Sequence, residues 1–506
     1  MTNTAVGYEA LTEHFNLSVI PHYRRSYVTS QGRGQVHVNN NQETHIYPKS
    51  YAVKEPNNPF SQIEFAIKYD GINLEILQAV FKLLDAKEVE AAIKIHPTGK
   101  FTRILWFIYE FLMETKLNIP DAKRLQYVDV LDPKHYFTSN GIKSQRHYIN
   151  NNLIGTASFC PTIRRTKSLT DFIAKGYDEK VRAMAAKYNP QIIARASHYF
   201  YTKETLSSYE IEREKPSKER MVRFINLLRQ AANIEILTKN QLIELQNSIV
   251  DPRFKDVDYR AQQNYVGENI NQYLQRIHYI SPRPENVEEL MMGLLETLEK
   301  AKQSAIYPVI IAAMISFGFV FIHPFEDGNG RIHRFLIHYI LSKEKFTPPG
   351  IIFPVSAVML QNINEYDHIL ELFSKPLLNE VTNYNLSNDG SLTVNQPTLN
   401  YYKYIDYTKM AEYLFECIDN TMHEHFEKEI EFLLNYDKTK REIQAVIDMP
   451  DRLIDLFIKF AIQNHGILGQ QKRTKYFVKL TDDEIDQLQS IVKLHMFKKA
   501  VSKHDE

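Results

Sequence analysis

Residues 323–334 hold the most concentrated set of chemically active side chains in the chain, in the order HPFEDGNGRIHR. Apolar helical patterns flank this stretch, and Gly328 and Gly330 allow a tight turn between them. Such a turn directs backbone amides and the positive end of the following helix toward one point, which favours an anion there. Arg331 and Arg334 are unfavourable near that helix end unless an anion lies between them. The pattern therefore predicts a polyphosphate site.

Two further side chains of the stretch supply chemistry beyond binding. His323, with an ordinary pKa near 6.5, is suited to accept a proton from an attacking hydroxyl at neutral pH. Asp327 offers the hard oxygen that magnesium takes alongside phosphate oxygens. Each group also has a structural interpretation, such as a histidine that caps a helix or arginines that pair with Glu326 or Asp327. Together the groups favour a transfer reaction on a nucleotide phosphate.

The composition is that of a soluble globular protein with more than one domain. The chain has 506 residues, of which 43% are hydrophobic and 24% charged. Lys and Arg together number 61, as do Asp and Glu, so no overall field attracts nucleic acid or an anionic membrane. Cys160 and Cys417 are far apart and offer no zinc cluster. With no signal-peptide pattern in MTNTAVGYEALTEHF, we expect a cytoplasmic protein without export.

Helical periodicity dominates the chain and predicts a mainly α fold. Apolar residues recur at helical spacing over 74–84 and 101–113. Residues 303–325 contain no charged side chain, but Pro308, Ser316 and Gly318 interrupt them, so we expect a buried central helix and not a membrane span. HPTGKFT, just before residue 103, is similar to a phosphate-binding loop but fails as one, because it lacks the first glycine and the Ser/Thr.

We expect three domains. Residues 1–190 form an N-terminal α+β domain of unknown role, residues 191–375 a helical core with a β-hairpin at about 262–283, and residues 376–506 a helical domain that is winged-helix-like in one alternative. Thr481 and Glu484 predict a capping box for the last helix. Four basic residues precede this helix. A solvent-exposed basic face is the commoner explanation for them, and a nucleic-acid-binding surface is the rarer one: Lys472, Arg473, Lys475 and Lys479.

The stretch at 323–334 resembles the signature of the Fic family, HxFx(D/E)GNGRxxR, at every specified position. The resemblance implies transfer of AMP from ATP to a hydroxyl side chain of a protein (Ser, Thr or Tyr), with release of pyrophosphate. By the same resemblance His323 is the general base, Asp327 holds Mg²⁺ and Phe325 packs the loop against the core. The implied phosphate contacts are Gly328, Asn329, Gly330, Arg331 and Arg334.

Two weaker matches flank the motif. In NYVGENI, Val266 and Gly267 resemble the start of the hairpin flap that covers the nucleotide and aligns a target segment as an added strand. In SAVMLQNINEY, Asn362 and Tyr366 lie where Fic proteins have residues near the adenine end. Ordinary helix surface and core remain the alternatives for this second pair.

The segment SSYEIERE, residues 207–214, is similar to the inhibitory helix (S/T)xxxE(G/N) of many Fic proteins, and we expect this helix over 207–215. The resemblance implies that Ser208 and Glu212 belong to the inhibitory motif and that Glu212 pairs with Arg334 and withholds it from the γ-phosphate. Arg213 departs from the family's Gly or Asn, which leaves Glu210 or Glu214 as alternative inhibitory carboxylates.

A purely local explanation of the same segment also exists. Ser207 and Glu210 have the spacing of a capping box, and Pro216 would end a short helix there.

Other functions stay open at this stage. The same site offers removal of AMP as a second activity, if a carboxylate such as Glu212 positions a water molecule. A different class of protein is also open, namely a regulatory module that binds nucleotide or DNA and has little catalytic activity. The sequence identifies neither the target protein nor the oligomeric state, so self-modification and a homodimer stay open, while the composition gives no indication of a membrane partner.

Overall fold

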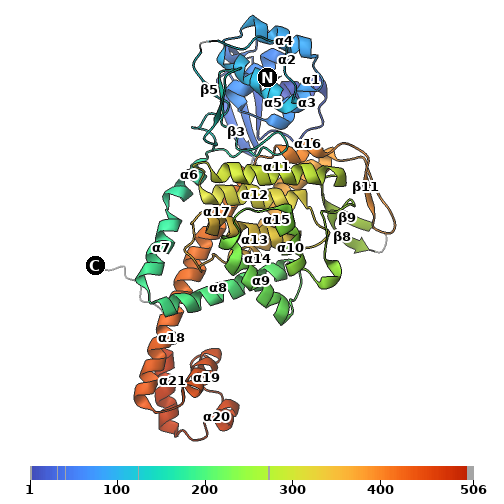
Figure 1. The fold of residues 1–506 in the computed structure, drawn as a ribbon. Coiled ribbons are helices and arrows are strands. Elements are labelled where there is room, and N and C mark those ends of the chain that lie inside the picture. The colour runs from blue at the N-terminus through green and yellow to red at the C-terminus, as the bar shows by residue number, and fades with distance from the viewer. Residues whose placement is uncertain (1–2, 31, 40–41, 124, 272–273, 498–506) are drawn as a thin grey trace, which may run out of the picture. The chain divides into compact units, whose positions relative to one another are not determined.

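The computed structural model describes residues 3–30, 32–39, 42–123, 125–271 and 274–497. Most of its elements are helices, which confirms the mainly α prediction (Figure 1). The chain groups into two compact units. The first comprises residues 1–176, 205–346 and 359–416, and the second residues 177–204, 347–358 and 417–506. The three-domain division with boundaries near 190 and 375 stays a prediction.

The N-terminal part of the first unit combines a small sheet with helices. Its four strands lie in the order β1-β2-β4-β3, with β2 and β4 parallel and the other pairs antiparallel. They are β1 (Asn3–Val6), β2 (Arg24–Thr29), β3 (Gln35–Asn39) and β4 (Gln42–Tyr47). The helices are α1 (Tyr8–Phe15), α2 (Pro59–Phe65), α3 (Leu74–Phe81), α4 (Ala86–Ile95), α5 (Lys100–Met113) and α6 (Lys167–Ala174). The helices predicted over 74–84 and 101–113 are thus confirmed as α3 and α5.

A second small sheet of this part has the order β5-β7-β6. Its strands are β5 (Val128–Asp129), β6 (Ile142–Ser144) and β7 (Ile149–Asn151). They are very short, which agrees with the irregular pattern of the sequence there.

The remainder of the first unit surrounds one buried helix, α12 (Pro308–Ile322), which packs against α11 (Pro284–Lys302) and α13 (Asn329–Lys343). Nearly all of its residues are buried, as the sequence predicts. Among the described residues, no helix is both long and apolar enough to cross a bilayer. The hairpin predicted at 262–283 is present as β8 (Tyr265–Asn271) and β9 (Leu274–Ile280).

Further elements complete this unit. They are α9 (Lys218–Gln230), α10 (Lys239–Ile249), α15 (Ile363–Glu380), β10 (Tyr384–Leu386), β11 (Leu392–Val394) and α16 (Leu399–Lys403). Three helices carry the chain between the two units: α8 (Pro190–Ile211), α14 (Val355–Gln361) and α17 (Thr408–Thr421).

The described residues of the second unit form helices joined by loops, without a strand. It contains α7 (Tyr177–Lys187), α18 (Glu427–Val446), α19 (Asp451–Gln463), α20 (Gln470–Tyr476) and α21 (Asp482–Met496). The capping box of Thr481 and Glu484 is confirmed at the start of α21. The winged-helix alternative is not confirmed for the basic C-terminal segment, because no strand occurs in residues 450–497, and β10 and β11 of the predicted domain belong to the first unit.

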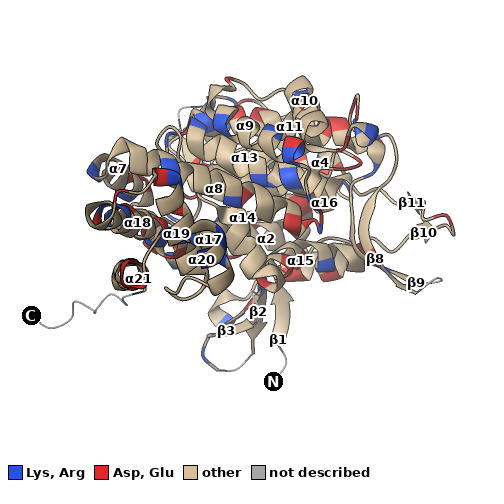
Figure 2. Ribbon diagram, turned by 90° about the horizontal axis from the view of Figure 1, so that it is seen from below, with Lys and Arg blue, Asp and Glu red and all other residues tan. Residues whose placement is uncertain are grey.

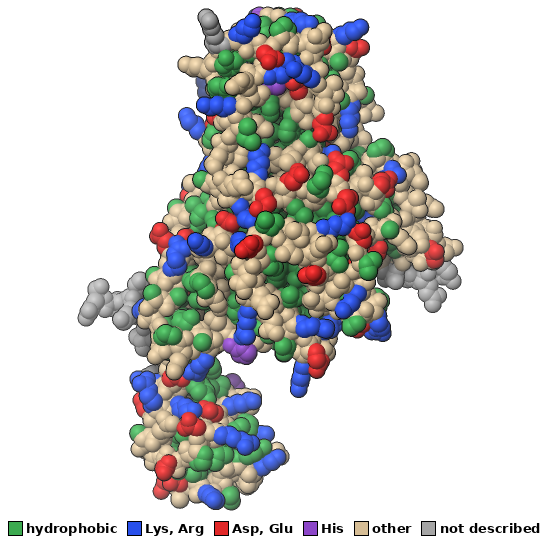
Figure 3. Space-filling view, in the orientation of Figure 1, with side chains coloured by type: hydrophobic (Ala, Val, Ile, Leu, Met, Phe, Trp, Pro, Cys, Tyr) green, Lys and Arg blue, Asp and Glu red, His purple; other side chains and the backbone are tan. Residues whose placement is uncertain are grey.

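Charged side chains of both signs are spread over the helices of both units (Figure 2). The space-filling view likewise shows basic and acidic side chains together on the surface of α18–α21 (Figure 3). This distribution agrees with the balanced composition.

Phe159 joins the N-terminal part of the first unit to the central helices. It is fully buried, and its carbonyl oxygen accepts a hydrogen bond of 2.8 Å from Thr297 Oγ1 of α11. A Cβ atom at Gly293 would lie 2.8 Å from Phe159 N, and one at Gly318 would lie 2.7 Å from Phe159 Cζ. The two glycines therefore leave the space that Phe159 fills.

Removal of this side chain should weaken the first unit. We expect Phe159→Ala to lower the free energy of unfolding by about 3–5 kcal/mol, because it leaves a cavity between packed helices. Gly293→Ala should cost about 1–3 kcal/mol through overpacking. Chemical denaturation monitored by circular dichroism measures both, and a change below about 1 kcal/mol for Phe159→Ala would show that the contact is dispensable.

Candidate functional site

His323 lies where α12 ends, in the left-handed conformation with φ 53°. Its Nδ1 is 3.1 Å from the carbonyl oxygen of Val320. Because a carbonyl only accepts hydrogen bonds, Nδ1 carries the proton and Nε2 keeps a lone pair. Burial lowers the pKa of His323 to about 4, so the ring is neutral at physiological pH. The structure thus presents a neutral imidazole whose Nε2 makes no hydrogen bond to the described residues.

The loop between α12 and α13 is closed by its own side chains. Phe325 is fully buried, and its backbone N–H donates to Asn329 Oδ1 at 3.0 Å. Asn329 Nδ2 donates to the carbonyl oxygen of Phe325 at 2.7 Å. Gly328, at φ 92°, supplies the left-handed turn before α13 begins. Asn329 therefore shapes the loop with both ends of its amide.

Arg260 is a residue of this site that the sequence analysis missed. Its guanidinium donates to the carbonyl oxygens of His323 at 2.8 Å, Gln262 at 2.8 Å and Pro282 at 2.5 Å. It is buried, and burial lowers its pKa to about 10. Arg260 thus ties the end of α12 to both ends of the hairpin. Its position just before the hairpin is the only indication that the sequence contains.

Arg334, in the second turn of α13, is buried and held by the end of α8. Its Nε donates to Ser208 Oγ at 2.9 Å, and its Nη2 donates to the carbonyl oxygen of Ser208 at 2.7 Å. Nη2 also forms an ion pair of 2.7 Å with Glu212 Oε1. A Cβ atom at Gly330 would collide with that same Oε1. The Glu212 carboxylate therefore lies directly against the backbone at the positive end of α13, where an anion is favoured.

Arg331 is buried as well and has carboxylates of its own. Its Nη2 is 2.6 Å from Asp327 Oδ1 and 3.1 Å from Glu214 Oε1, and its Nη1 is 3.2 Å from Glu214 Oε2. The guanidinium also lies 5.3 Å from the centre of the Tyr209 ring. Its Nε is buried without a hydrogen-bond partner among the described residues. Two carboxylates from the chain after α8, Glu212 and Glu214, thus each engage one motif arginine.

The segment at 207–215 differs from the predicted short helix. Helix α8 runs from Pro190 to Ile211, so Ser207 lies inside it and cannot cap its start. The capping-box interpretation of Ser207 and Glu210 is therefore wrong, since the helix begins well upstream. Arg213 follows the helix with φ 57°, a left-handed conformation that costs a residue with a side chain about 1–2 kcal/mol. This conformation explains why the motif (S/T)xxxE(G/N) has Gly or Asn at the position that Arg213 occupies here.

The remaining predicted site residues lie at different depths. Val266 is 44% exposed on β8, and Gly267 beside it has no room for a Cβ because of the carbonyl oxygen of Arg276. Tyr366 on α15 is buried, and its ring centre lies 6.3 Å from that of His333. Asn362 is exposed at the N-cap of α15 and forms no side-chain capping bond. The structure thus places Tyr366 in the core beside α13 and leaves Asn362 on the surface.

A magnesium ion would find only part of its coordination shell in these residues. The described residues contain no group of three His, Cys, Asp or Glu side chains arranged to hold a metal. The Asp327 side chain is 41% exposed, and its Oδ1 accepts from Arg331 Nη2. One accessible carboxylate fits a magnesium ion whose other ligands are phosphate oxygens and water.

Comparison with known proteins identifies the region around this site. Residues 236–341 match the model of the Fic/DOC family, which confirms the predicted resemblance for this part of the chain. A protein adenylyltransferase Fic of Drosophila yakuba is 31% identical over 139 residues, 27% of this chain and 24% of the relative. One of Nematostella vectensis is 30% identical over 110 residues, 22% of this chain and 23% of the relative. The chain thus spans about a quarter of the length of these curated relatives.

Two solved structures also show similarity. One is a Fic domain containing signaling protein of Bacteroides thetaiotaomicron, with 20% identity, a TM-score of 0.36 and coverage of 52% of this chain and 96% of that one. The other is a Fic family protein of Desulfovibrio desulfuricans, with 15% identity, a TM-score of 0.36 and coverage of 64% and 84%.

The ionisation of His323 can be tested directly. The ¹³Cε1 resonance of His323, assigned by its loss in His323→Ala, should keep its neutral shift from pH 8 down to about 5, since burial lowers the pKa of this histidine to about 4. The lowered pKa also means that protonation favours the unfolded chain, so its contribution to stability falls as the pH drops below about 6.5. A midpoint near 6.5 in the folded protein would contradict the lowered pKa.

Proposed function

We propose that this protein transfers AMP from ATP to a hydroxyl side chain of a protein and that Glu212 and Glu214 hold it in an inhibited state. The observation that carries the proposal is the pair of buried guanidiniums of Arg331 and Arg334 at the positive end of α13, together with His323 Nε2, which makes no hydrogen bond to the residues that the structure describes. The names of the adenylyltransferase relatives support the choice of reaction.

The proposed chemistry uses groups whose positions are described above. His323 Nε2 accepts the proton of the target hydroxyl while its oxygen forms a bond to the α-phosphorus of ATP. The bond between the α-phosphorus and the bridging oxygen breaks, and pyrophosphate leaves. Arg331 and Arg334 offset the negative charge of the outer phosphates. Arg331 Nε, which has no hydrogen-bond partner among the described residues, offers one more donor.

Magnesium fits the same arrangement through Asp327. Asp327 would hold the ion, which would supply positive charge to the phosphate oxygens. Arg331 Nη2 engages Asp327 Oδ1 and keeps this carboxylate near the proposed phosphate position. Arg260 acts as a positioning residue, because its bonds to the carbonyl oxygens of His323 and Pro282 fix the base relative to the hairpin.

In the proposed inhibited state, two carboxylates occupy positions that phosphates take in the active one. Glu212 engages Arg334, and Glu214 engages Arg331. The motif resemblance implies one inhibitory glutamate, whereas here the contact of Glu214 with Arg331 adds a second. Glu214 can therefore act together with Glu212 and need not replace it as the inhibitory carboxylate. Removal of AMP, a homodimer and a cytoplasmic location stay predictions of the sequence.

Loss of the Glu212 carboxylate should release the enzyme. We expect Glu212→Gly to raise AMP transfer to the protein itself or to proteins of a lysate by about tenfold or more, because Arg334 becomes available to ATP. Intact-mass analysis after incubation with ATP measures the added AMP. The double variant Glu212→Gly, His323→Ala should show no transfer, and labelling that persists in it would remove His323 as the base.

Glu214 should contribute separately to inhibition. We expect Glu214→Gln in the Glu212→Gly background to raise the transfer rate by a further factor of about 2–10, since its partly exposed ion pair to Arg331 is lost, along with its ion pair of 3.0 Å to Arg220. Glu210→Gln is the matched control, because Glu210 is exposed on α8 and forms no ion pair with the described residues. Equal rates for the Glu214 and Glu210 variants would assign inhibition to Glu212 alone.

A further inference from the structure

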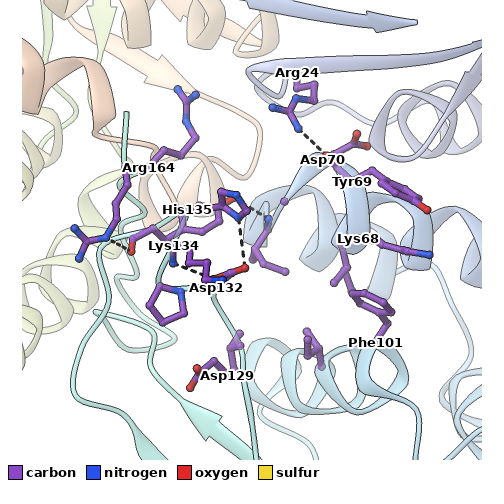
Figure 4. A pocket seen from close by; sticks show the side chains of 18 of the residues that line it. Arg24, Lys68, Tyr69, Asp70, Phe101, Asp129, Asp132, Lys134, His135 and Arg164 are labelled. Atoms are coloured by element: carbon purple, nitrogen blue, oxygen red, sulfur yellow. Dashed lines mark hydrogen bonds and ion pairs between the residues drawn. The ribbon is translucent and has the colours of Figure 1, made fainter. Parts of the chain in front are cut away.

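A second candidate site lies in the N-terminal part of the first unit, away from the motif. It is a cavity of about 940 Å³ between the segment Ala66–Asp70, the start of α5, the loop after β5 and the start of α6. We call it the N-terminal pocket. Figure 4 shows Lys68 and Phe101 on one side of its open space and Asp129, Lys134 and Arg164 across from them. The volume is in the range of small-molecule sites.

The lining of the N-terminal pocket has a surplus of positive charge. It includes seven Lys or Arg residues and four Asp or Glu residues, whereas the whole chain has equal numbers of both. The four acidic side chains already have partners. Glu43 accepts from Arg24 at 2.9 Å, Asp129 from Asn150 at 2.6 Å and Asp132 from the backbone N–H of Lys134 at 2.9 Å. Only the charge of Glu43 is balanced by a cation, because hydrogen bonds from an amide and a backbone N–H leave Asp129 and Asp132 negatively charged.

Asp70, the fourth acid, is buried and only partly ionised at neutral pH. It accepts from Ser26 Oγ at 2.5 Å and from the backbone N–H of Tyr8 at 3.4 Å. Burial raises its pKa to about 7. Its negative charge at neutral pH is thus only partial.

Five cations of the pocket have no acidic partner. Arg24 pairs with Glu43, and Arg164 pairs with Asp406 at 2.9 Å. The other five are exposed and form no ion pair with any part of the chain that the structure describes: Lys68, Lys100, Lys134, Arg165 and Lys167. Like charges gathered around one hollow repel each other, and an anion in the hollow relieves that repulsion.

Two helix starts add to the positive potential of the pocket. Lys100 is the first residue of α5, and Lys167 is the first residue of α6. Neither helix has an acidic residue in its first turn, and the N-cap of α5, Gly99, has no side chain to cap it. A lysine at the positive end of a helix is unfavourable by itself. The stretch HPTGKFT, which fails as a phosphate-binding loop, thus ends at the edge of a basic cavity.

We propose that the N-terminal pocket binds a small ligand that carries at least two phosphate groups. The five cations without an acidic partner outnumber Asp129, Asp132 and the partly ionised Asp70, and two helix starts add to this surplus, so more than one negative charge is needed to balance it. Asp129 and Asp132 in the same lining disfavour the long, uniformly negative backbone of a nucleic acid, which needs an extended basic track. The ligand is either an inorganic oligophosphate or a nucleotide, and both share the diphosphate group.

The test uses the full chain with pyrophosphate and ADP as probes. The pocket variant is Lys68→Gln, Lys100→Gln, Lys134→Gln, and the matched control is Lys54→Gln, Lys87→Gln, Lys116→Gln. The control removes the same charge from exposed positions outside the pocket. Isothermal titration calorimetry gives the affinity, and hydrogen exchange locates the site. Exchange separates binding here from binding at the motif, because only the former protects residues 66–71 and 99–104.

We expect pyrophosphate, ADP or both to protect residues 66–71 and 99–104 in the wild type and the control. The pocket variant should bind about tenfold or more weakly at this site, since three charge-assisted contacts are lost. Protection by ADP alone would assign a nucleotide, and protection by pyrophosphate would show that the diphosphate suffices. The proposal is overturned if neither probe protects these residues, if all three proteins bind alike, or if a short RNA protects them when neither probe does.

Discussion

Two guanidinium groups buried at the positive end of α13 determine how the candidate site is built. Arg331 and Arg334 are both about 1% exposed, and a buried cation without a counter-charge costs several kcal/mol. The protein supplies that counter-charge from three carboxylates. Glu212 and Glu214 come from the chain after α8, and Asp327 comes from the loop itself. A bound triphosphate would supply the same counter-charge. The carboxylates of Glu212 and Glu214 and the phosphates of ATP are therefore alternative partners of the two arginines.

The sequence predicted those parts of the site that are contiguous in the chain. The stretch from His323 to Arg334 is one helix end, one turn and one helix start, so its spacing alone specifies the geometry. The buried helix α12 was equally clear from its lack of charged residues. The segment with Ser208 and Glu212 was found through its motif, and the structure places it against Arg334.

The contacts that the sequence did not predict depend on tertiary packing. Arg260 reaches the carbonyl oxygens of His323 and Pro282, which no local pattern specifies. The capping box predicted for Ser207 and Glu210 was wrong for a related reason. Two residues three apart look the same in the sequence whether they lie inside a helix or at its start, and α8 begins well before Ser207. In the N-terminal pocket, five cations from separate segments converge around one cavity, and only the fold brings them together.

Competition between the Glu212 carboxylate and ATP for Arg334 can be measured by thermal unfolding of the wild type and Glu212→Gln, each with and without ATP and Mg²⁺. Glutamine keeps the size of the side chain but removes its charge. We predict that the variant unfolds at a lower temperature than the wild type without nucleotide, and that saturating ATP raises the Tm of the variant by more than that of the wild type. An equal or smaller increase in the variant would contradict the competition.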